Sequence, residues 1–153
     1  MPQNPYSPFS SFIHFISLAR QGKVRFPKGL KGTRIRLDDG EWLVLRELVI
    51  SPELNSPEPE AVFRPRFHIK GMSARQNEWF SWLPIPFFAG LPGFRRKLWL
   101  LDPASGDFSG YYEWQTESDA NAYAQSFAMR FMTARSIPGS VSARIQNCSA
   151  LFR

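Results

Sequence analysis

The sequence predicts an α+β fold in which two helices cover one face of a four-stranded antiparallel sheet. After residue 60 the chain holds four short segments that alternate apolar with polar residues, which is the pattern of half-buried strands. Two segments with helix-start signals lie between them, giving the order strand, helix, strand, strand, helix, strand. The 153 residues suit one domain with a sizeable core.

Residues 1–60 are predicted to form an N-terminal extension made of a helix, a β-hairpin and a linker. Ser10 or Ser11 can cap a helix that runs to about Arg20. The hairpin covers residues 33–50, because Asp-Gly between two alternating runs is the preferred sequence of a tight turn with positive φ. Three prolines then interrupt the pattern, which predicts a proline-rich linker.

Residues 61–153 are predicted to form the domain itself. Its elements are a strand over 61–70, a helix over 73–82, an irregular apolar segment over 83–94, strands over 94–102 and 108–115, a helix from 116 to the Pro138-Gly139 stop, and a strand over 140–146. Tyr123, Phe127 and Phe131 recur every four residues, which predicts one buried stripe on the second helix. Because each βαβ crossover is right-handed, both helices share one sheet face and the arrangement is ferredoxin-like.

Capping signals mark the start of both helices. Ser73 with Gln76 forms a capping box, in which each side chain accepts a hydrogen bond from the backbone of the other residue. Thr116 with Asp119 resembles the same motif, with Asp in place of the usual Glu or Gln.

The alternation along the strands assigns one sheet face to the helices and leaves the other polar. The apolar face is predicted to hold Phe63, Phe67, Ile69, Leu98, Leu100, Tyr112, Trp114, Val141, Ala143 and Ile145. The polar face is predicted to hold Arg64, Arg66, His68, Lys97, Trp99, Tyr111, Glu113, Ser142 and Arg144. Cations, an imidazole, a carboxylate, a phenol and an indole would therefore converge on that face.

Two interpretations of the polar face stay open. In the first, Glu113 pairs with neighbouring Arg or Lys side chains, and the face meets water, the hairpin or a second subunit. In the second, His68 and Glu113 supply proton transfer, with His68 as the base and Tyr111 and Glu113 placed to polarise or orient a substrate. The residues that would then hold an anion or enolate are Arg64, Arg66 and Lys97.

A recurring pattern spans the second and third predicted strands. Gly93-Phe94, Lys97, Trp99-Leu100, Asp102 and then Gly110-Tyr111-Tyr112-Glu113-Trp114 resemble the dimeric α/β-barrel family of monooxygenase-like proteins. The resemblance covers residues 61–146. It implies a ferredoxin-like fold, a homodimer whose two sheets pair, and an apolar cavity between helices and sheet. The extension is additional to the minimal family pattern. It could cover the cavity mouth, or it could cover the open sheet face in place of a second subunit.

The resemblance also implies a function. It favours a cofactor-independent enzyme that acts on a hydrophobic aromatic or polyketide-like small molecule, although the fold also hosts cyclases, haem-using enzymes and simple ligand binders. Aromatic side chains would line or gate the pocket, namely Trp79, Phe80, Trp82, Phe87, Phe88, Trp99 and Phe127. Aromatics make up 15% of the chain, and they fill cores as well as pockets.

The charge distribution suggests a rival function. The net charge is +6, and the run from Arg20 to Arg36 contains seven cations and no acidic residue. Such a run is either a solvated face or the contact surface for an anionic partner. The apolar residues of the first helix, which include Phe12, Phe15 and Ile16, either pack against the domain or lie, with this run, on a membrane surface. The second interpretation implies peripheral membrane contact through residues 9–36, in a non-catalytic protein that binds apolar ligands.

Several classes of protein lack support in the sequence. With only two histidines, His14 and His68, and no CxxC or HExxH spacing, a histidine-rich metal site within one chain is not expected. No cofactor is predicted, although haem ligation by one histidine stays open. No nucleic-acid-binding motif is present. The single cysteine, Cys148, together with the lack of a signal peptide or a long apolar run, leads us to expect a cytoplasmic protein.

Overall fold

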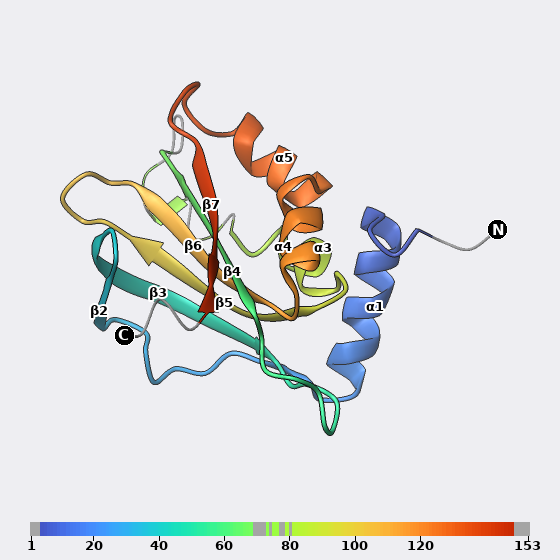
Figure 1. The fold of residues 1–153 in the computed structure, drawn as a ribbon. Coiled ribbons are helices and arrows are strands. Elements are labelled where there is room, and N and C mark those ends of the chain that lie inside the picture. Colours follow the sequence, from blue (N-terminus) through green and yellow to red (C-terminus); the bar gives the residue numbers. More distant parts are fainter. Residues whose placement is uncertain (1–3, 69–72, 74, 77–78, 80, 149–153) are drawn as a thin grey trace.

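The protein is built around one antiparallel sheet with helices on one side (Figure 1). The structure is a computed structural model that describes residues 4–68, 73, 75, 76, 79 and 81–148. The elements are α1 (Pro8–Arg20), β1 (Val24–Arg25), β2 (Arg34–Leu37), β3 (Gly40–Ile50), β4 (Ala61–Phe67), α3 (Ile85–Ala89), β5 (Phe94–Leu101), β6 (Phe108–Trp114), α4 (Glu117–Ala124), α5 (Phe127–Ala134) and β7 (Ser142–Asn147). The strand order is β1-β3-β5-β6-β4-β7, with β2 paired to β3. The segment β5-β6-β4-β7 has the predicted ferredoxin-like order, and the α+β fold class is confirmed.

The N-terminal hairpin lengthens this sheet at the β5 edge. β3 pairs with β5 in antiparallel register, and the pairing shifts by one residue between Val44 and Arg46. The predicted hairpin is confirmed, with Asp38 and Asp39 in its turn and Gly40 at φ 130°. β1 was not predicted, since two residues carry no periodic signal. The boundary at residue 60 stays a prediction about independent folding.

The first helix begins earlier than the sequence suggested. Ser7 caps α1, because its Oγ accepts a hydrogen bond from the backbone N–H of Ser10 at 3.1 Å. The prediction of a cap at Ser10 or Ser11 is therefore wrong. Ser11 is buried instead, and its hydroxyl donates to the carbonyl of Pro86 at 3.0 Å. A side chain at Gly90 would collide with the Ser11 backbone, so glycine lets α1 lie directly on α3.

The long helix predicted after residue 116 is two helices. α4 ends before Ser126, whose hydroxyl caps α5 by accepting from the backbone of Met129 at 3.3 Å. The cap turns the chain, so the stripe predicted for Tyr123, Phe127 and Phe131 is wrong. Tyr123 is buried in the core, whereas Phe127 is 47% exposed.

Both capping signals are confirmed. The backbone N–H of Asp119 donates to the hydroxyl of Thr116 at 3.1 Å. Ser73 and Gln76 exchange the two bonds of a capping box, at 3.1 and 3.2 Å. Much of the helix predicted over 73–82 lies outside the described residues, as do Ile69 and Lys70 of the predicted strand.

One strand presents the opposite faces from those predicted. The β5–β6 pairing shifts at the start of β5, so the alternation that follows is inverted. Lys97 and Trp99 therefore lie on the helix side of the sheet, and Leu98 and Leu100 lie on the other side. The sequence assignment of these four residues was wrong because the bulge is invisible to a strict period of two.

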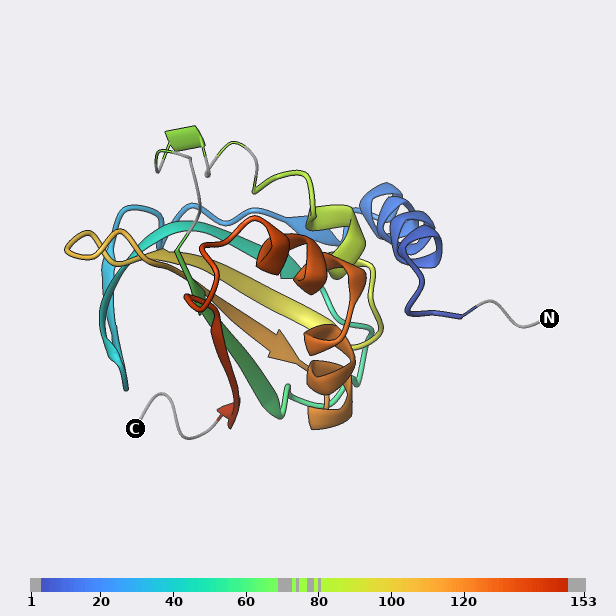
Figure 2. The same cartoon turned by 90° about the horizontal axis from the view of Figure 1, so that it is seen from above.

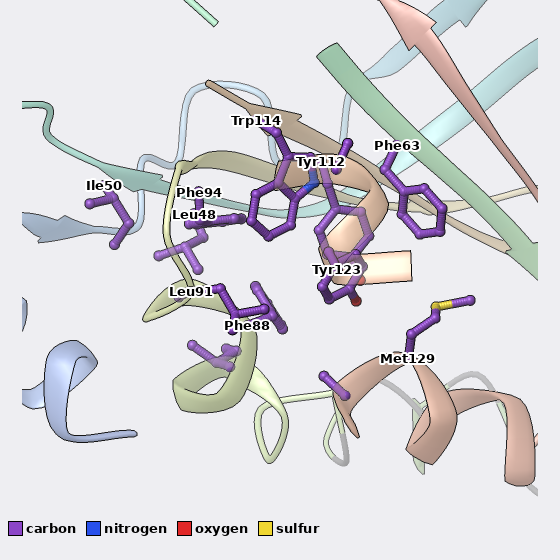
Figure 3. Packing of buried hydrophobic residues seen from close by; sticks show 14 of the residues in the cluster. Leu48, Ile50, Phe63, Phe88, Leu91, Phe94, Tyr112, Trp114, Tyr123 and Met129 are labelled. Atoms are coloured by element: carbon purple, nitrogen blue, oxygen red, sulfur yellow. The ribbon is translucent and has the colours of Figure 1, made fainter. Parts of the chain in front are cut away.

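Each sheet face carries a hydrophobic cluster. The side that we call the helix face is built around Leu48, Phe63, Phe88, Phe94, Tyr112, Trp114, Tyr123 and Met129 (Figure 3). The opposite side, called the hairpin face, is built around Leu37, Trp42, Val44, Val62, Leu98, Leu100 and Tyr111. Figure 2 shows the end of the β2–β3 hairpin and the helices on opposite sides of the sheet. The extension thus covers part of the face that was predicted to be open.

Charge pairs fix the end of the hairpin on the far strands. Asp39 accepts from Arg64 of β4 at 3.1 Å, and Asp38 accepts from Arg144 of β7 at 2.9 Å. We call these four residues the hairpin latch. Burial opposes ionisation of Asp39, but bonds from Trp42 and Arg64 outweigh it, so the pKa of Asp39 lies below its usual range.

Candidate functional site

A buried lysine lies in a cage of aromatic rings on the helix face. The Nζ of Lys97 is 4.3 Å from the ring centroid of Trp99, 4.4 Å from that of Tyr112 and 4.5 Å from that of Phe88. Lys97 is only 6% exposed. Among the described residues, no carboxylate or other hydrogen-bond acceptor is assigned to its amine. We call this arrangement the lysine cage.

The local sequence explains why the cage forms. Lys97 and Trp99 are two apart on β5, so both side chains point to the same face. Lys97 is opposite Tyr112 in the β5–β6 register. The Tyr112 ring folds back over Gly110, where any Cβ would lie 2.1 Å from a ring carbon. Phe88 closes the cage from α3.

A second cation adjoins the cage. The Arg46 guanidinium lies 3.7 Å from the ring centroid of Trp82 and 4.8 Å from that of Trp99. It also donates a hydrogen bond to the Ser81 hydroxyl at 2.8 Å. Arg46 reaches the helix face from β3, so the N-terminal hairpin contributes directly to the site.

The electrostatics of the cage favour an uncharged amine. Each ring face offers an ammonium about 0.5 to 2 kcal/mol. Removing a single charge from water costs several kcal/mol, and no counter-ion among the described residues offsets that cost. Burial, with like-charge repulsion from Arg46, therefore holds the pKa of Lys97 well below its usual range.

Two hollows meet beside the lysine cage. A cavity of about 20 Å³ adjoins Lys97 and is lined also by Ser81, Pro84 and Met132. This volume accommodates a water molecule. An apolar groove of about 270 Å³ lies next to it, lined by Leu83, Pro84, Phe87, Phe127, Ala128 and Phe131. Pro84 lines both hollows, so they are neighbours on the helix face.

The hairpin face carries buried charges of a different kind. Arg96 donates to Glu47 at 2.6 Å and to Glu113 at 3.3 Å. Burial opposes its charge, but Glu47 and Glu113 outweigh that effect and raise the pKa of Arg96. The expectation that Glu113 pairs with a cation across strands is thus confirmed.

A cavity of about 800 Å³ opens beside Glu113 on the same face. Its walls include Tyr111, Cys148 and the carboxylates of Glu58, Glu60, Glu113 and Glu117. Burial raises the pKa of Cys148 to about 11, and burial with the nearby Glu113 raises the pKa of Tyr111. Both groups therefore stay protonated near neutral pH, and Cys148 is a poor nucleophile.

His68 lies at the opposite end of the hairpin face. Its Nδ1 is 3.0 Å from Asp107, which also accepts from Arg66 at 2.9 Å. Its side chain is 41% exposed. Asp107 and Glu113 are six positions apart along β6, or about 20 Å at about 3.3 Å per residue. The structure therefore does not bring His68 to Glu113, and Tyr111 is also several residues away.

The aromatic residues predicted for a pocket divide into three groups. Phe88 and Trp99 form the lysine cage, while Phe87 and Phe127 line the apolar groove. Trp82 stacks on Arg46, whereas Trp79 is 70% exposed and lines neither hollow. Phe80 lies outside the described residues.

Of the predicted anion-binding residues, only Lys97 belongs to the candidate site. Arg64 and Arg66 lie on the hairpin face, where Asp39 and Asp107 pair with them. Sequence reasoning missed Arg46 and Tyr112. The pair Gly110 and Tyr112 did carry a signal, because a glycine two residues before a tyrosine on a strand leaves room for its ring.

The fold has known counterparts among solved structures. An uncharacterised ferredoxin-fold protein related to antibiotic biosynthesis monooxygenases, from Listeria monocytogenes, aligns with TM-score 0.52 and 13% identity over 70% of this chain and 63% of that chain. A major regulator of staphylococcal pathogenesis aligns with TM-score 0.52 and 13% identity over 88% and 90%. A haem-degrading enzyme from Listeria monocytogenes reaches TM-score 0.48 and 14% identity over 69% of each chain.

The two likenesses with TM-score 0.52 show the fold that the sequence resemblance implied. At such identities the shared fold does not extend to substrates or catalytic residues. The chain spans less than two thirds of the first of these structures. No protein-family model and no curated protein sequence matches the chain. Within the described part of the chain, every helix is too short or too polar to cross a membrane.

Proposed function

We propose that the protein is a monooxygenase-like enzyme that acts, without a cofactor, on a hydrophobic aromatic or polyketide-like small molecule. One observation carries this proposal, namely the lysine cage beside an apolar groove. The groove suits the body of an aromatic molecule. Lys97 is the proton acceptor, and Arg46 stabilises the oxyanion that forms when the substrate loses a proton.

The reaction requires only dioxygen as co-reactant. Lys97 takes a proton from an activated CH₂ group beside an aromatic carbonyl, and the resulting enolate oxygen lies against Arg46. Dioxygen adds to the carbanion, the O–O bond breaks, and the CH₂ becomes C=O while the second oxygen leaves as water. The carbon loses four electrons and the two oxygen atoms gain them, so no external reductant is needed.

The roles predicted for His68, Tyr111 and Glu113 stay predictions. The separation along β6 argues against a proton relay that joins all three. A single role for His68 is still testable by substitution.

Binding and oxygen uptake test the proposal separately. A polycyclic aromatic ketone with an activated CH₂ group should quench tryptophan fluorescence, since Trp82 and Trp99 lie at the site. An oxygen electrode should record uptake with the wild-type protein and none with Lys97→Met. The matched control, Lys28→Met on the exposed basic run, should behave as wild type. Absence of both quenching and oxygen uptake would contradict the proposal.

A specific surface favours the membrane-binding alternative. Phe9 and Ile13 of α1 are exposed, and the ring contact between Phe12 and Phe87 connects the helix to the groove region. Phe15, in contrast, packs against the core. The first 37 residues contain no acidic side chain, which suits an anionic bilayer.

Vesicle binding tests this alternative. Sedimentation with phosphatidylserine vesicles at low salt should retain the wild-type protein and release Phe9→Ser/Ile13→Ser. Leu54→Ser changes an exposed apolar residue outside the basic run and serves as control. Lack of binding by the wild-type protein would exclude this function.

The homodimer and the cytoplasmic location also belong to the proposal. The hairpin already covers part of the face on which a second sheet would pack, so a partner would meet the remaining part, beside the large cavity. Native mass spectrometry of the protein as purified tests the dimer, and a co-purified apolar molecule would support the ligand class.

A further inference from the structure

Lys97 has a chemical capacity beyond that of a proton acceptor. A primary amine in its uncharged form can attack a carbonyl carbon, which an ammonium cannot do. The amine of Lys97 is buried within a cage of three aromatic rings, and neither a donor nor an acceptor of a hydrogen bond contacts it in the described part of the chain. Its lone pair is therefore not committed to a structural hydrogen bond.

We propose that Lys97 is a nucleophile that forms a Schiff base with a hydrophobic aldehyde. The inference rests on the same pocket as the proposed function, but it needs no oxygen chemistry.

The condensation is balanced without an oxidant or a reductant. The Lys97 nitrogen forms a bond to the aldehyde carbon, and the C=O π bond breaks to give a carbinolamine. The carbon–oxygen bond then breaks, and the oxygen leaves as water with the two protons that the amine has lost. The products are RCH=N–Lys97 and one water molecule.

The two hollows suit an aldehyde that has one apolar chain. The cavity of about 20 Å³ beside the amine has room for one water molecule, and the condensation releases one water. The apolar groove shares Pro84 with this cavity and suits the chain of the aldehyde.

The cage also suits the product. The imine RCH=N–Lys97 is uncharged, so, like the free amine, it places no buried charge beside Arg46. The faces of Trp99, Tyr112 and Phe88 surround its nitrogen with apolar contacts.

Reductive trapping with peptide mapping tests the inference. Full-length protein is incubated at about pH 6.5 with octanal and cyanoborohydride, and the five lysines are mapped by mass spectrometry. At that pH an ordinary lysine is uncharged in about one molecule in ten thousand. Label at Lys97 should exceed label at exposed Lys28 and Lys31 by about tenfold or more. The N-terminal amine, which also reacts, is the internal reference.

Two variants sharpen the result. Lys97→Met should lose the dominant label, while Lys28→Arg should keep it. The wild-type map decides the question even if Lys97→Met fails to fold.

The outcomes separate this inference from the proposed function. Label spread over Lys28 and Lys31 without preference for Lys97 would overturn the inference. If octanal quenches tryptophan fluorescence but leaves Lys97 unlabelled, the ligand pocket is supported and the role of Lys97 as nucleophile is contradicted. If neither octanal nor the polycyclic ketone quenches the fluorescence, both the ligand pocket and the nucleophile are contradicted.

Discussion

The two faces of the sheet treat buried positive charge in opposite ways. On the hairpin face, Arg64 meets Asp38 and Asp39, and Arg96 meets Glu47 and Glu113. On the helix face, Lys97 meets three aromatic rings and no carboxylate within the described residues. On the hairpin face, carboxylates therefore neutralise these buried cations locally, and the resulting pairs have a structural role.

This difference separates structural from functional charge. A paired buried cation contributes to the geometry of the fold, because loss of one partner leaves the other uncompensated. An unpaired buried amine lowers stability, so its presence indicates a role other than holding the fold together. Substitutions on the two faces should therefore change stability in opposite directions.

The largest effect is expected from Arg64→Met on the hairpin face. The substitution removes the buried partner of Asp38 and Asp39, which then keep only their pairs with Arg144, so the end of the hairpin is held less tightly. Hydrogen bonds to charged groups contribute about 1.5 to 3 kcal/mol, and a loss of this size is expected. Urea denaturation followed by tryptophan fluorescence measures the change.

The control for that variant is Arg34→Met. Arg34 and Glu41 form an exposed pair at 3.2 Å on the same hairpin. Such pairs contribute about 0 to 1 kcal/mol. Equal losses of unfolding free energy in the two variants would show that the hairpin latch stabilises the fold no more than an exposed ion pair does.

The second prediction concerns Lys97→Met on the helix face. Methionine replaces an unpaired buried amine with an apolar chain of similar length, so the protein should gain about 1 kcal/mol of unfolding free energy. The same variant should lose oxygen uptake and Schiff-base labelling. A destabilised variant would mean that the amine has a structural partner, and the contrast between the faces would disappear.

Much of the fold could be predicted from the sequence because the local signals agree with the topology. The Asp-Gly turn, the Thr116 cap and the period-two strands each predicted an element that is present. The handedness of βαβ crossovers then fixed the strand order. Ser126 broke the second helix, and the sequence did not reveal this because a serine cap and a serine in a helix look alike.

Less of the candidate site could be predicted from the sequence. The bulge at the start of β5 moved Lys97 and Trp99 to the helix face, and one extra residue in a strand leaves no reliable mark in a single sequence. Arg46 joins them from a hairpin about 50 residues away in the chain. Such a contact depends on strand pairing that periodicity does not specify.

A third prediction tests whether the hairpin face takes part in the reaction. His68→Ala should change oxygen uptake by less than about twofold, because His68 lies on the side of the sheet opposite the lysine cage. Its partly exposed pair with Asp107 contributes about 1 kcal/mol or less to stability. Loss of turnover in a folded His68→Ala protein would restore His68 as the base and weaken the role of Lys97.

The smallest effect is expected from protonation of the hairpin latch. The pKa of Asp39 is lower in the folded protein than in the unfolded chain, so its contribution to stability is present above the unfolded pKa of about 3.9 and is lost as the pH falls through the folded value. Below about pH 4 the hairpin should loosen before the helix face does. Hydrogen exchange of the hairpin amides reports this opening. So does exchange of the Trp42 indole N–H, which donates to Asp39 at 2.9 Å.

The control variant is Asp39→Asn, which keeps an acceptor but cannot titrate. Hydrogen exchange in the hairpin of this variant should lack the acid-dependent step. If the variant and the wild-type protein follow the same pH profile, the latch does not control the hairpin, and acid acts on both faces of the sheet alike.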